Sequence, residues 1–253
     1  MWSSEPRSLV VTGGSSGIGA AVALAAARSG WHVWIGYVAG RDRAAALAAE
    51  ISDLGHSATP IRLPLDDTDD LRRGVDTMAA SRFPPSAAIL CGGLPPDVRP
   101  LLKLTPDQFR RQFECAVVGN ATLLAELWRL CFRRRGGGHV LAVLSAAQGP
   151  SVAPHMASYV AAKGGFEALL RAAVAELGPA GLRVSVARPG YVETPMLDAF
   201  DARFLERARD KSGSHRFLQP CEVAGALVSA LRTPPDGATV GEIAIEQPQV
   251  AFA

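Results

Sequence analysis

The feature that most constrains this chain is a repeated alternation of short apolar runs with longer stretches rich in Ala and Leu. Each apolar run is followed by a turn, and each longer stretch has the apolar spacing of a helix. This alternation is typical of a parallel sheet covered by helices. It predicts an α/β fold, a single Rossmann-type doubly wound domain of about seven parallel strands with helices on both faces. The runs lie at residues 8–11, 32–37, 61–65, 88–91, 139–145, 183–187 and 242–246.

No internal repeat and no low-complexity linker divides the chain, so we expect residues 1–253 to form one domain. Thr105, followed by Pro106 and Gln108, predicts a capping box at the start of one long helix. The stretch from Thr194 to Phe217 is polar and charged, and we expect it to be irregular. The first expected helix follows the glycine-rich segment after residue 11 and ends near residue 29. The other expected helices span residues 41–54, 69–82, 105–135, 158–177 and 222–231.

The composition argues against several kinds of partner. The chain has 26 basic and 24 acidic side chains and a formal net charge of +2, so nothing in it favours nucleic acid or an anionic membrane. The four cysteines form no CxxC pair and the five histidines lack ligand spacing, so we expect no metal site. We also expect no signal peptide, because a strand and a glycine loop follow directly on the N-terminus. No apolar run approaches the ~20 residues of a membrane span, so we expect a cytoplasmic protein.

A glycine-rich loop lies between the first apolar run and the first expected helix. Its sequence, TGGSSGIG, places glycines where a tight turn and close backbone approach are needed. The free N–H groups of the helix start would then bind a pyrophosphate. The spacing is GxxxGxG rather than the common GxGxxG, and the alternative is a glycine-rich turn without a ligand. The expected dinucleotide contacts in this loop are Gly13, Ser15, Ser16, Gly17, Ile18 and Gly19.

The end of the second apolar run indicates which dinucleotide binds. An acidic residue there would bind the ribose hydroxyls of NAD, but the chain has Gly36, Tyr37 and Val38, followed by Arg41 and Arg43. A 2′-phosphate would meet no repulsion and could pair with a guanidinium. We therefore favour NADP over NAD, with Tyr37 and Arg41 as contacts. The alternative is that both arginines are solvated charges at a helix start.

Tyr159 and Lys163 form a YxxxK pair near the start of an expected helix. Residues four apart share one face of a helix, so the ammonium of Lys163 can lie beneath the phenol of Tyr159. A nearby cation stabilises a phenolate, which suits Tyr159 as a general acid for a carbonyl oxygen. On its own the pair could equally be an ordinary surface contact.

Together these features closely resemble the classical short-chain dehydrogenase/reductase family, and the resemblance covers nearly the whole chain. The glycine loop, the Tyr159–Lys163 pair and residues 188–194 (RPGYVET) carry it. Within the family the chain is most similar to 3-oxoacyl carrier-protein reductases and polyketide ketoreductases. The resemblance implies that residues 194–217 form a substrate lid. It implies cofactor contacts at Asp66, Gly92, Tyr159, Lys163, Pro189, Gly190, Val192 and Thr194.

The chain departs from the family pattern at several catalytic positions. The family's catalytic serine lies thirteen residues before the tyrosine, where this chain has Ala146, so Ser145 or Ser151 would have to substitute. The family's helix asparagine falls at Ala116, with Asn120 one turn later. The usual Asn-Asn-Ala-Gly is Leu-Cys-Gly-Gly at residues 90–93. We take Tyr159, Lys163 and Ser145 as the catalytic candidates.

Three functions compete on this evidence. The favoured one is an NADPH-dependent ketoreductase in which Tyr159 protonates the developing alkoxide; a polyketide or other secondary-metabolite ketone is one candidate substrate. The second is a tailoring protein of the cyclase, dehydratase or isomerase type, or a nucleotide-sensing scaffold, that binds NADP without ordinary ketone reduction. The third, an interaction protein, would need a degraded glycine loop. The resemblance also implies a homo-oligomer, a tetramer or a dimer, formed through helices 105–135 and 158–177.

Overall fold

In a computed structural model, which describes residues 7–149, 154–211 and 215–245, seven strands form one parallel sheet in the order β3-β2-β1-β4-β5-β6-β7. The order reverses on the two sides of β1, as in a doubly wound fold, so the predicted fold class is confirmed. The strands are β1 (Ser8–Thr12), β2 (His32–Tyr37), β3 (Ala58–Arg62), β4 (Ala87–Leu90), β5 (Gly138–Val143), β6 (Leu182–Ala187) and β7 (Gly241–Ile243).

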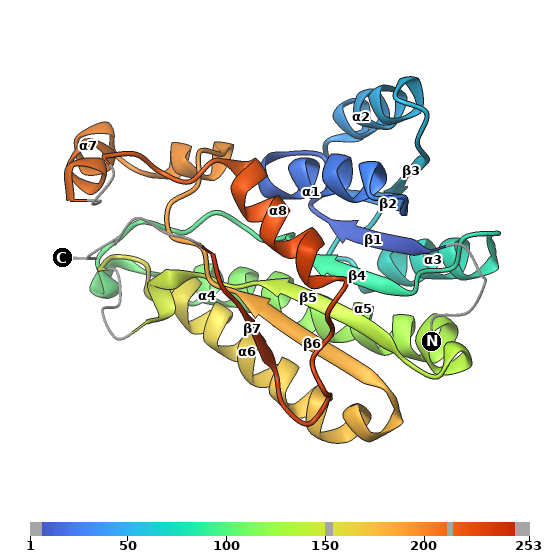
Figure 1. Ribbon diagram of the computed structural model, residues 1–253. Coiled ribbons are helices and arrows are strands. Elements are labelled where there is room, and N and C mark those ends of the chain that lie inside the picture. Colours follow the sequence, from blue (N-terminus) through green and yellow to red (C-terminus); the bar gives the residue numbers. More distant parts are fainter. Residues whose placement is uncertain (1–6, 150–153, 212–214, 246–253) are drawn as a thin grey trace.

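Helices cover both faces of this sheet (Figure 1). They are α1 (Gly17–Arg28), α2 (Arg41–Asp53), α3 (Thr68–Ala80), α4 (Pro106–Phe113), α5 (Asn120–Leu127), α6 (Ala157–Leu177), α7 (Ala202–Lys211) and α8 (Pro220–Ala230). One apolar core joins the sheet to α3, α5 and α6, and a second joins it to α1, α2 and α8. Strands β1, β4 and β5 are buried along their whole length, which explains their continuous apolar runs.

The third strand is displaced from its predicted position. The apolar run at residues 61–65 predicts a strand there, whereas β3 pairs with β2 over Ala58–Arg62. As an edge strand β3 tolerates Pro60, because one of its sides has no ladder to complete. Leu63 and Leu65 follow β3 and are buried in the core. The apolar run therefore reflects buried core residues that follow β3, not the residues that pair with β2.

Two C-terminal segments also differ from expectation. Residues 194–217 were expected to be irregular, but they contain α7, whose charged residues lie along an amphipathic helix. The run at residues 242–246 corresponds to β7, which pairs with β6 and ends at Ile243; residue 246 lies outside the described residues. Both differences arise because short or highly charged segments give a weak apolar pattern.

The long predicted helix after residue 105 is present but not regular. Thr105 and Gln108 form the predicted capping box, in which the Thr105 N–H donates to Gln108 Oε1 at 2.9 Å. Two wider π-helical turns, Glu114–Gly119 and Trp128–Phe132, interrupt the helix. Such turns are rare and shift the face that a helix presents.

By length and composition this helix, Pro106–Arg135, could cross a membrane, with a mean hydropathy of 1.3 over its best window. Polar and charged residues such as Glu114, Asn120 and Glu126 interrupt its apolar sequence. Half of that window is buried inside the protein, and Leu123, Leu127 and Phe132 belong to the core beneath the sheet. The core helix of a globular domain meets the same criterion.

Two histidines are buried within the sheet. His32 Nδ1 lies 2.7 Å from Ser57 Oγ, and its ring stacks on Phe83 with 4.0 Å between centroids. His139 Nε2 lies 3.0 Å from Ser185 Oγ. Burial lowers the pKa of both histidines to about 4, and nearby arginines add to the effect. Both rings are therefore neutral in the folded protein near pH 7.

These histidines predict a loss of stability in mild acid. The unfolded chain gains protons as the pH falls through 6.5, whereas the folded chain does so only near 4, so stability is full above this window and falls within it. Each histidine contributes at most ~1.4 kcal/mol per pH unit. Urea unfolding across the window should show this slope, and a His32→Asn/His139→Asn variant should reduce it. An unchanged slope in that variant would contradict the assignment.

Candidate active site

The glycine loop connects β1 to α1 at the carboxyl edge of the sheet. Gly13 and Gly17 have φ angles of 64° and 52°, which favour glycine. A Cβ on Gly19 would lie 2.2 Å from the carbonyl oxygen of Gly13, so the helix start can approach the loop only without a side chain. The loop has the shape that a bound pyrophosphate requires.

A groove of about 340 Å³ runs along this loop and opens to solvent. Its opposite wall comes from the segments that follow β4 and β6. Of the predicted cofactor contacts, it brings together Gly13, Ser16, Gly17, Ile18, Gly19, Gly92 and Thr194. A dinucleotide therefore fits the residues present, with its pyrophosphate against the glycine loop.

Ser15 of the glycine loop and Arg43 of α2 converge on Gly40, the N-cap residue of α2. A Cβ on Gly40 would lie 2.6 Å from Ser15 Oγ and 2.7 Å from Arg43 Nη2. Arg41, the predicted phosphate contact, is the exposed first residue of α2. The sequence pointed to Arg41 rather than Arg43 as the contact, because residue spacing does not show which arginine of α2 lies beside the glycine loop. Tyr37 ends β2 beside this corner.

Asp66 is exposed and directly follows the buried Leu65. A Cβ on Gly119 would lie 2.0 Å from the carbonyl oxygen of Leu65. The π-helical turn thus places its glycine against the backbone that leads into Asp66. This contact explains why the helix carries a glycine at that turn.

The groove continues into a second cavity of about 100 Å³ that also opens to solvent. Ile18, Cys91, Gly93, Thr194 and Met196 line both spaces. The cavity alone is lined by Leu94, Pro96, Val143, Leu144, Ser145, Ala147, Met156, Tyr159, Lys163, Pro189, Gly190, Tyr191, Val192, Leu197 and Phe200. The nicotinamide end of a dinucleotide bound in the groove would therefore extend into a largely apolar cavity.

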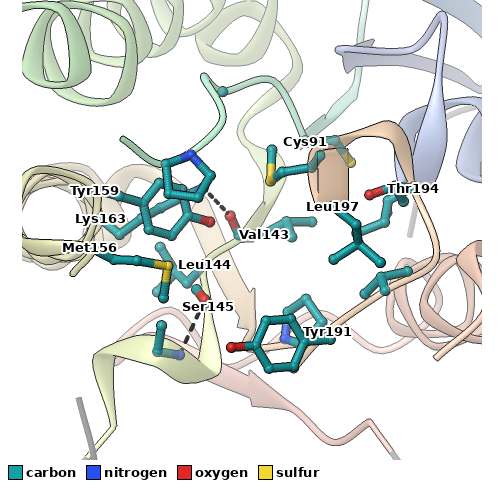
Figure 2. A pocket seen from close by; sticks show the side chains of 18 of the residues that line it. Cys91, Val143, Leu144, Ser145, Met156, Tyr159, Lys163, Tyr191, Thr194 and Leu197 are labelled. Carbon is teal, nitrogen blue, oxygen red and sulfur yellow. Dashed lines mark hydrogen bonds between the residues drawn. The ribbon is translucent and has the colours of Figure 1, made fainter. Parts of the chain in front are cut away.

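Tyr159 and Lys163 lie on successive turns of α6 and line this cavity, with the Tyr159 hydroxyl directed into it (Figure 2). Both side chains are buried, with 8% and 7% exposed. Lys163 Nζ donates a hydrogen bond to the Val143 carbonyl at 2.8 Å and lies 5.8 Å from the centre of the Tyr159 ring. The predicted phenol–ammonium pair is therefore assembled at the end of β5.

Ser145 faces the same cavity from the turn that follows β5 (Figure 2). Its Oγ accepts a hydrogen bond from the Ala147 N–H at 3.2 Å, so its own proton can be donated elsewhere. Ala146 is not among the described residues that line the cavity, and its N–H donates to the Pro189 carbonyl at 3.0 Å. Ser151, the other predicted substitute, lies outside the described residues.

Asn120 does not occupy the position of the family's helix asparagine. Its Nδ2 donates to the carbonyls of Cys115 and Ala116 at 3.3 and 3.0 Å, within its own helix. It therefore satisfies carbonyls that the π-helical turn releases. We assign it a structural part in this helix.

The lid side of the cavity follows β6. Val192 pairs with Leu218 in an isolated bridge that fixes the Pro189–Thr194 segment. Leu197 and Phe200 line the cavity, and Phe200 packs both against Met156 and Tyr159 and against the cluster of Tyr191, Leu197 and Phe217. Residues of the 194–217 segment therefore line the cavity.

Sequence reasoning did not assign roles to Cys91, Met156 or Tyr191, which also line the cavity. Cys91 directly follows β4, a position that could have identified it, whereas Tyr191 lies four residues after the end of β6. Burial raises the pKa of the Cys91 thiol to about 12, although the charge of Lys163 opposes this. Burial also raises the pKa of Tyr191 to about 12. Both groups are therefore neutral at physiological pH. Within the described chain no cluster of acidic, His and Cys side chains could hold a metal.

Comparison with known proteins decides the family. A profile described as short chain dehydrogenase matches residues 7–203. The chain belongs to this family. It is 33% identical over 223 residues to cis-4-hydroxycyclohexanecarboxylate dehydrogenase from Sinomonas cyclohexanicum, covering 87% of each chain. It is 25% identical over 221 residues to a 3-oxoacyl-[acyl-carrier-protein] reductase from Staphylococcus aureus, covering 87% of this chain and 89% of the relative.

A short chain dehydrogenase from Burkholderia cenocepacia, solved in complex with NADP, has a similar structure with a TM-score of 0.84. It is 25% identical and covers 95% of this chain and 96% of its own. Membership of the short chain dehydrogenase family and the similarity to these relatives identify this chain as an oxidoreductase.

The glycine loop predicts a clear loss of cofactor binding in one variant. Gly19→Ala should weaken NADPH binding at least ~10-fold, because its Cβ would displace the Gly13 backbone from the pyrophosphate site. Gly225→Ala on α8 is the matched control, since its Cβ meets nothing within 4 Å. Fluorescence titration with NADPH measures both. Wild-type affinity in folded Gly19→Ala would contradict the assigned role of the loop.

Proposed function

We propose that this protein reduces a ketone with NADPH, with Tyr159 as the general acid. The observation that carries the proposal is the meeting of two hydroxyl groups, from Tyr159 and Ser145, in a cavity continuous with the dinucleotide groove. A ketone oxygen held between them would receive two hydrogen bonds. Its carbon would then face the opening of the groove.

The chain's own residues have distinct tasks in this reaction. A bound NADPH supplies hydride to the carbonyl carbon. Ser145 donates a hydrogen bond to the carbonyl oxygen and stabilises the charge that develops there. Tyr159 transfers its phenolic proton to that oxygen, which completes the alcohol. Lys163, anchored to the Val143 carbonyl, places a positive charge beside the phenol and stabilises the phenolate that remains.

Two observations support NADP over NAD. Ser15 Oγ and Arg43 Nη2 converge on Gly40, where a 2′-phosphate would accept their hydrogen bonds. The relative from Burkholderia cenocepacia was solved with NADP. We therefore assign the phosphate contact to Arg43 together with Ser15, and place Arg41 at the edge of the same site.

The substrate we propose is a ketone with a substantial apolar body. Leu144, Met156, Leu197 and Phe200 surround the reacting hydroxyls and would bury such a body. The named relatives act on a hydroxycyclohexane acid and on 3-oxoacyl carrier proteins, so cyclic ketones and 3-oxoacyl thioesters are the first compounds to test. A polyketide or related secondary-metabolite ketone belongs to the same chemical class.

A second function deserves a direct comparison because Ala116 and Cys91 replace family asparagines. In that case the protein would bind NADP and act as a cyclase, dehydratase, isomerase or nucleotide sensor. It would bind NADPH tightly without oxidising it in the presence of any ketone.

We also propose a homo-oligomer located in the cytoplasm. Phe113 and Val118 are exposed on the long helix after residue 105, at 37% and 42%, and would be covered in a pair of subunits. Gly165 on α6 lies against Phe113 and Val117, so the two helices form one continuous face.

The proposed acid predicts a selective loss of turnover. Tyr159→Phe should reduce kcat by at least ~10²-fold, because the phenolic proton is removed while the ring remains. NADPH binding should change little. The measurement follows NADPH absorbance with decalones, quinones and 3-oxoacyl thioesters. Near-normal turnover in Tyr159→Phe would contradict the mechanism.

The phosphate site predicts a change in cofactor preference. Arg43→Ala should weaken NADPH binding at least ~10-fold and leave NADH binding almost unchanged, because only NADPH carries the 2′-phosphate. Arg41→Ala is the matched control and should have the smaller effect. Titration of each variant with both cofactors measures the difference. Equal weakening of NADPH and NADH would place Arg43 outside a phosphate site.

A further inference from the structure

We propose that Gln148, anchored by Glu167, is the positioning residue that holds Ser145 at the distance from Tyr159 that the reaction needs. This inference rests on the proposed ketone reduction. It concerns a side chain that is not among the described residues lining the cavity, and it explains how a serine turn without the family's usual sequence can be fixed.

Gln148 closes the turn that carries Ser145. The Ser145 N–H donates to Gln148 Oε1 at 3.1 Å, and the Ala147 N–H donates to Ser145 Oγ at 3.2 Å. Together these bonds form a capping box around a single short turn, Ala146–Gln148. They fix both the backbone and the hydroxyl of Ser145, so the free proton of that hydroxyl has a defined direction.

The other end of the Gln148 amide joins this turn to the catalytic helix. Gln148 Nε2 donates to Glu167 Oε2 at 3.4 Å. Glu167 lies one turn after Lys163 on α6, the helix that also carries Tyr159. The Ser145 turn and the Tyr159 helix are therefore connected through one amide, which sets the separation of the two reacting hydroxyls.

Glu167 is itself held on its far side. Arg188 Nη2 lies 2.9 Å from Glu167 Oε1, and Arg188 also pairs with Glu242 on β7. Arg171, one turn along α6, binds the same carboxylate. Although burial raises the pKa of Glu167, its hydrogen bonds and ion pairs with Arg188 and Arg171 outweigh this and lower the pKa. Glu167 is therefore a fixed anion that accepts the Gln148 amide.

The test is a double-mutant cycle on kcat for a ketone that the wild type reduces. Ser145→Ala should lower kcat by ~10²–10³-fold, because one donor to the oxyanion is lost. Gln148→Ala should lower kcat by ~10–100-fold, because the Ser145 hydroxyl would move by up to about 1 Å from the position the reaction needs. In the Ser145→Ala background, Gln148→Ala should have less than about a twofold further effect, since it acts through Ser145. NADPH affinity should stay unchanged in all three.

A charge-based rescue separates positioning from general loss of structure. Gln148→Glu places a carboxylate against Glu167, and the repulsion should lower kcat about as much as Gln148→Ala. Adding Glu167→Gln restores a donor amide facing an acceptor carboxylate, and kcat should recover at least ~5-fold.

Gln108→Ala is the matched stability control. Gln108 forms an equivalent capping box with Thr105, and its amide Nε2 donates to Asp97 at 2.8 Å. The Gln108→Ala variant therefore loses the same kinds of hydrogen bond as Gln148→Ala, but away from the cavity. It should lower the Tm similarly and leave kcat near the wild-type value. Normal kcat in Gln148→Ala, or equal losses with and without Ser145, would overturn the inference while ketone reduction stands. A wild type that reduces no ketone would overturn the proposed function and this inference together.

Discussion

The buried ammonium of Lys163 is the group on which the arrangement of the cleft depends. It donates to the Val143 carbonyl at the end of β5, and this bond ties α6 to the carboxyl edge of the sheet. A buried cation is stable only where such acceptors meet it, so Lys163 can take few other positions. Tyr159, one turn earlier on the same helix, is thereby held with its hydroxyl in the cavity that adjoins the glycine-loop groove.

The two sides of the cleft are built on different principles. The cofactor side is a backbone surface, formed where Gly13, Gly17 and Gly19 allow the loop and helix to approach closely. The reacting side is made of side chains, with Tyr159 and Ser145 presented from a helix and a short turn. Because the turn is joined to the helix through Gln148 and Glu167, the reacting side is as well defined as the glycine loop.

Most of the fold could be predicted because fully buried parallel strands such as β4 and β5 leave unbroken apolar runs. β3 was misplaced because an edge strand is only partly buried, so the neighbouring core residues gave the stronger pattern. In the site, motif spacing correctly indicated that Tyr159 and Lys163 lie together. Counting thirteen residues directed attention to Ala146, whereas the turn after β5 presents Ser145, and such a turn is set by hydrogen bonds that spacing does not show. The convergence of Arg43 and Ser15 depends likewise on the three-dimensional path of the loop.

In the proposed reaction hydride passes to a ketone carbon while Tyr159 protonates the carbonyl oxygen. The most direct measurement is mass spectrometry of the product formed from a cyclic ketone and NADPH deuterated at the transferable position. This reaction should yield an alcohol that carries one deuterium on its carbinol carbon, formed in equal amount to the NADP released. Recovery of unlabelled ketone or of a rearranged or dehydrated product, with the labelled NADPH intact, would contradict it.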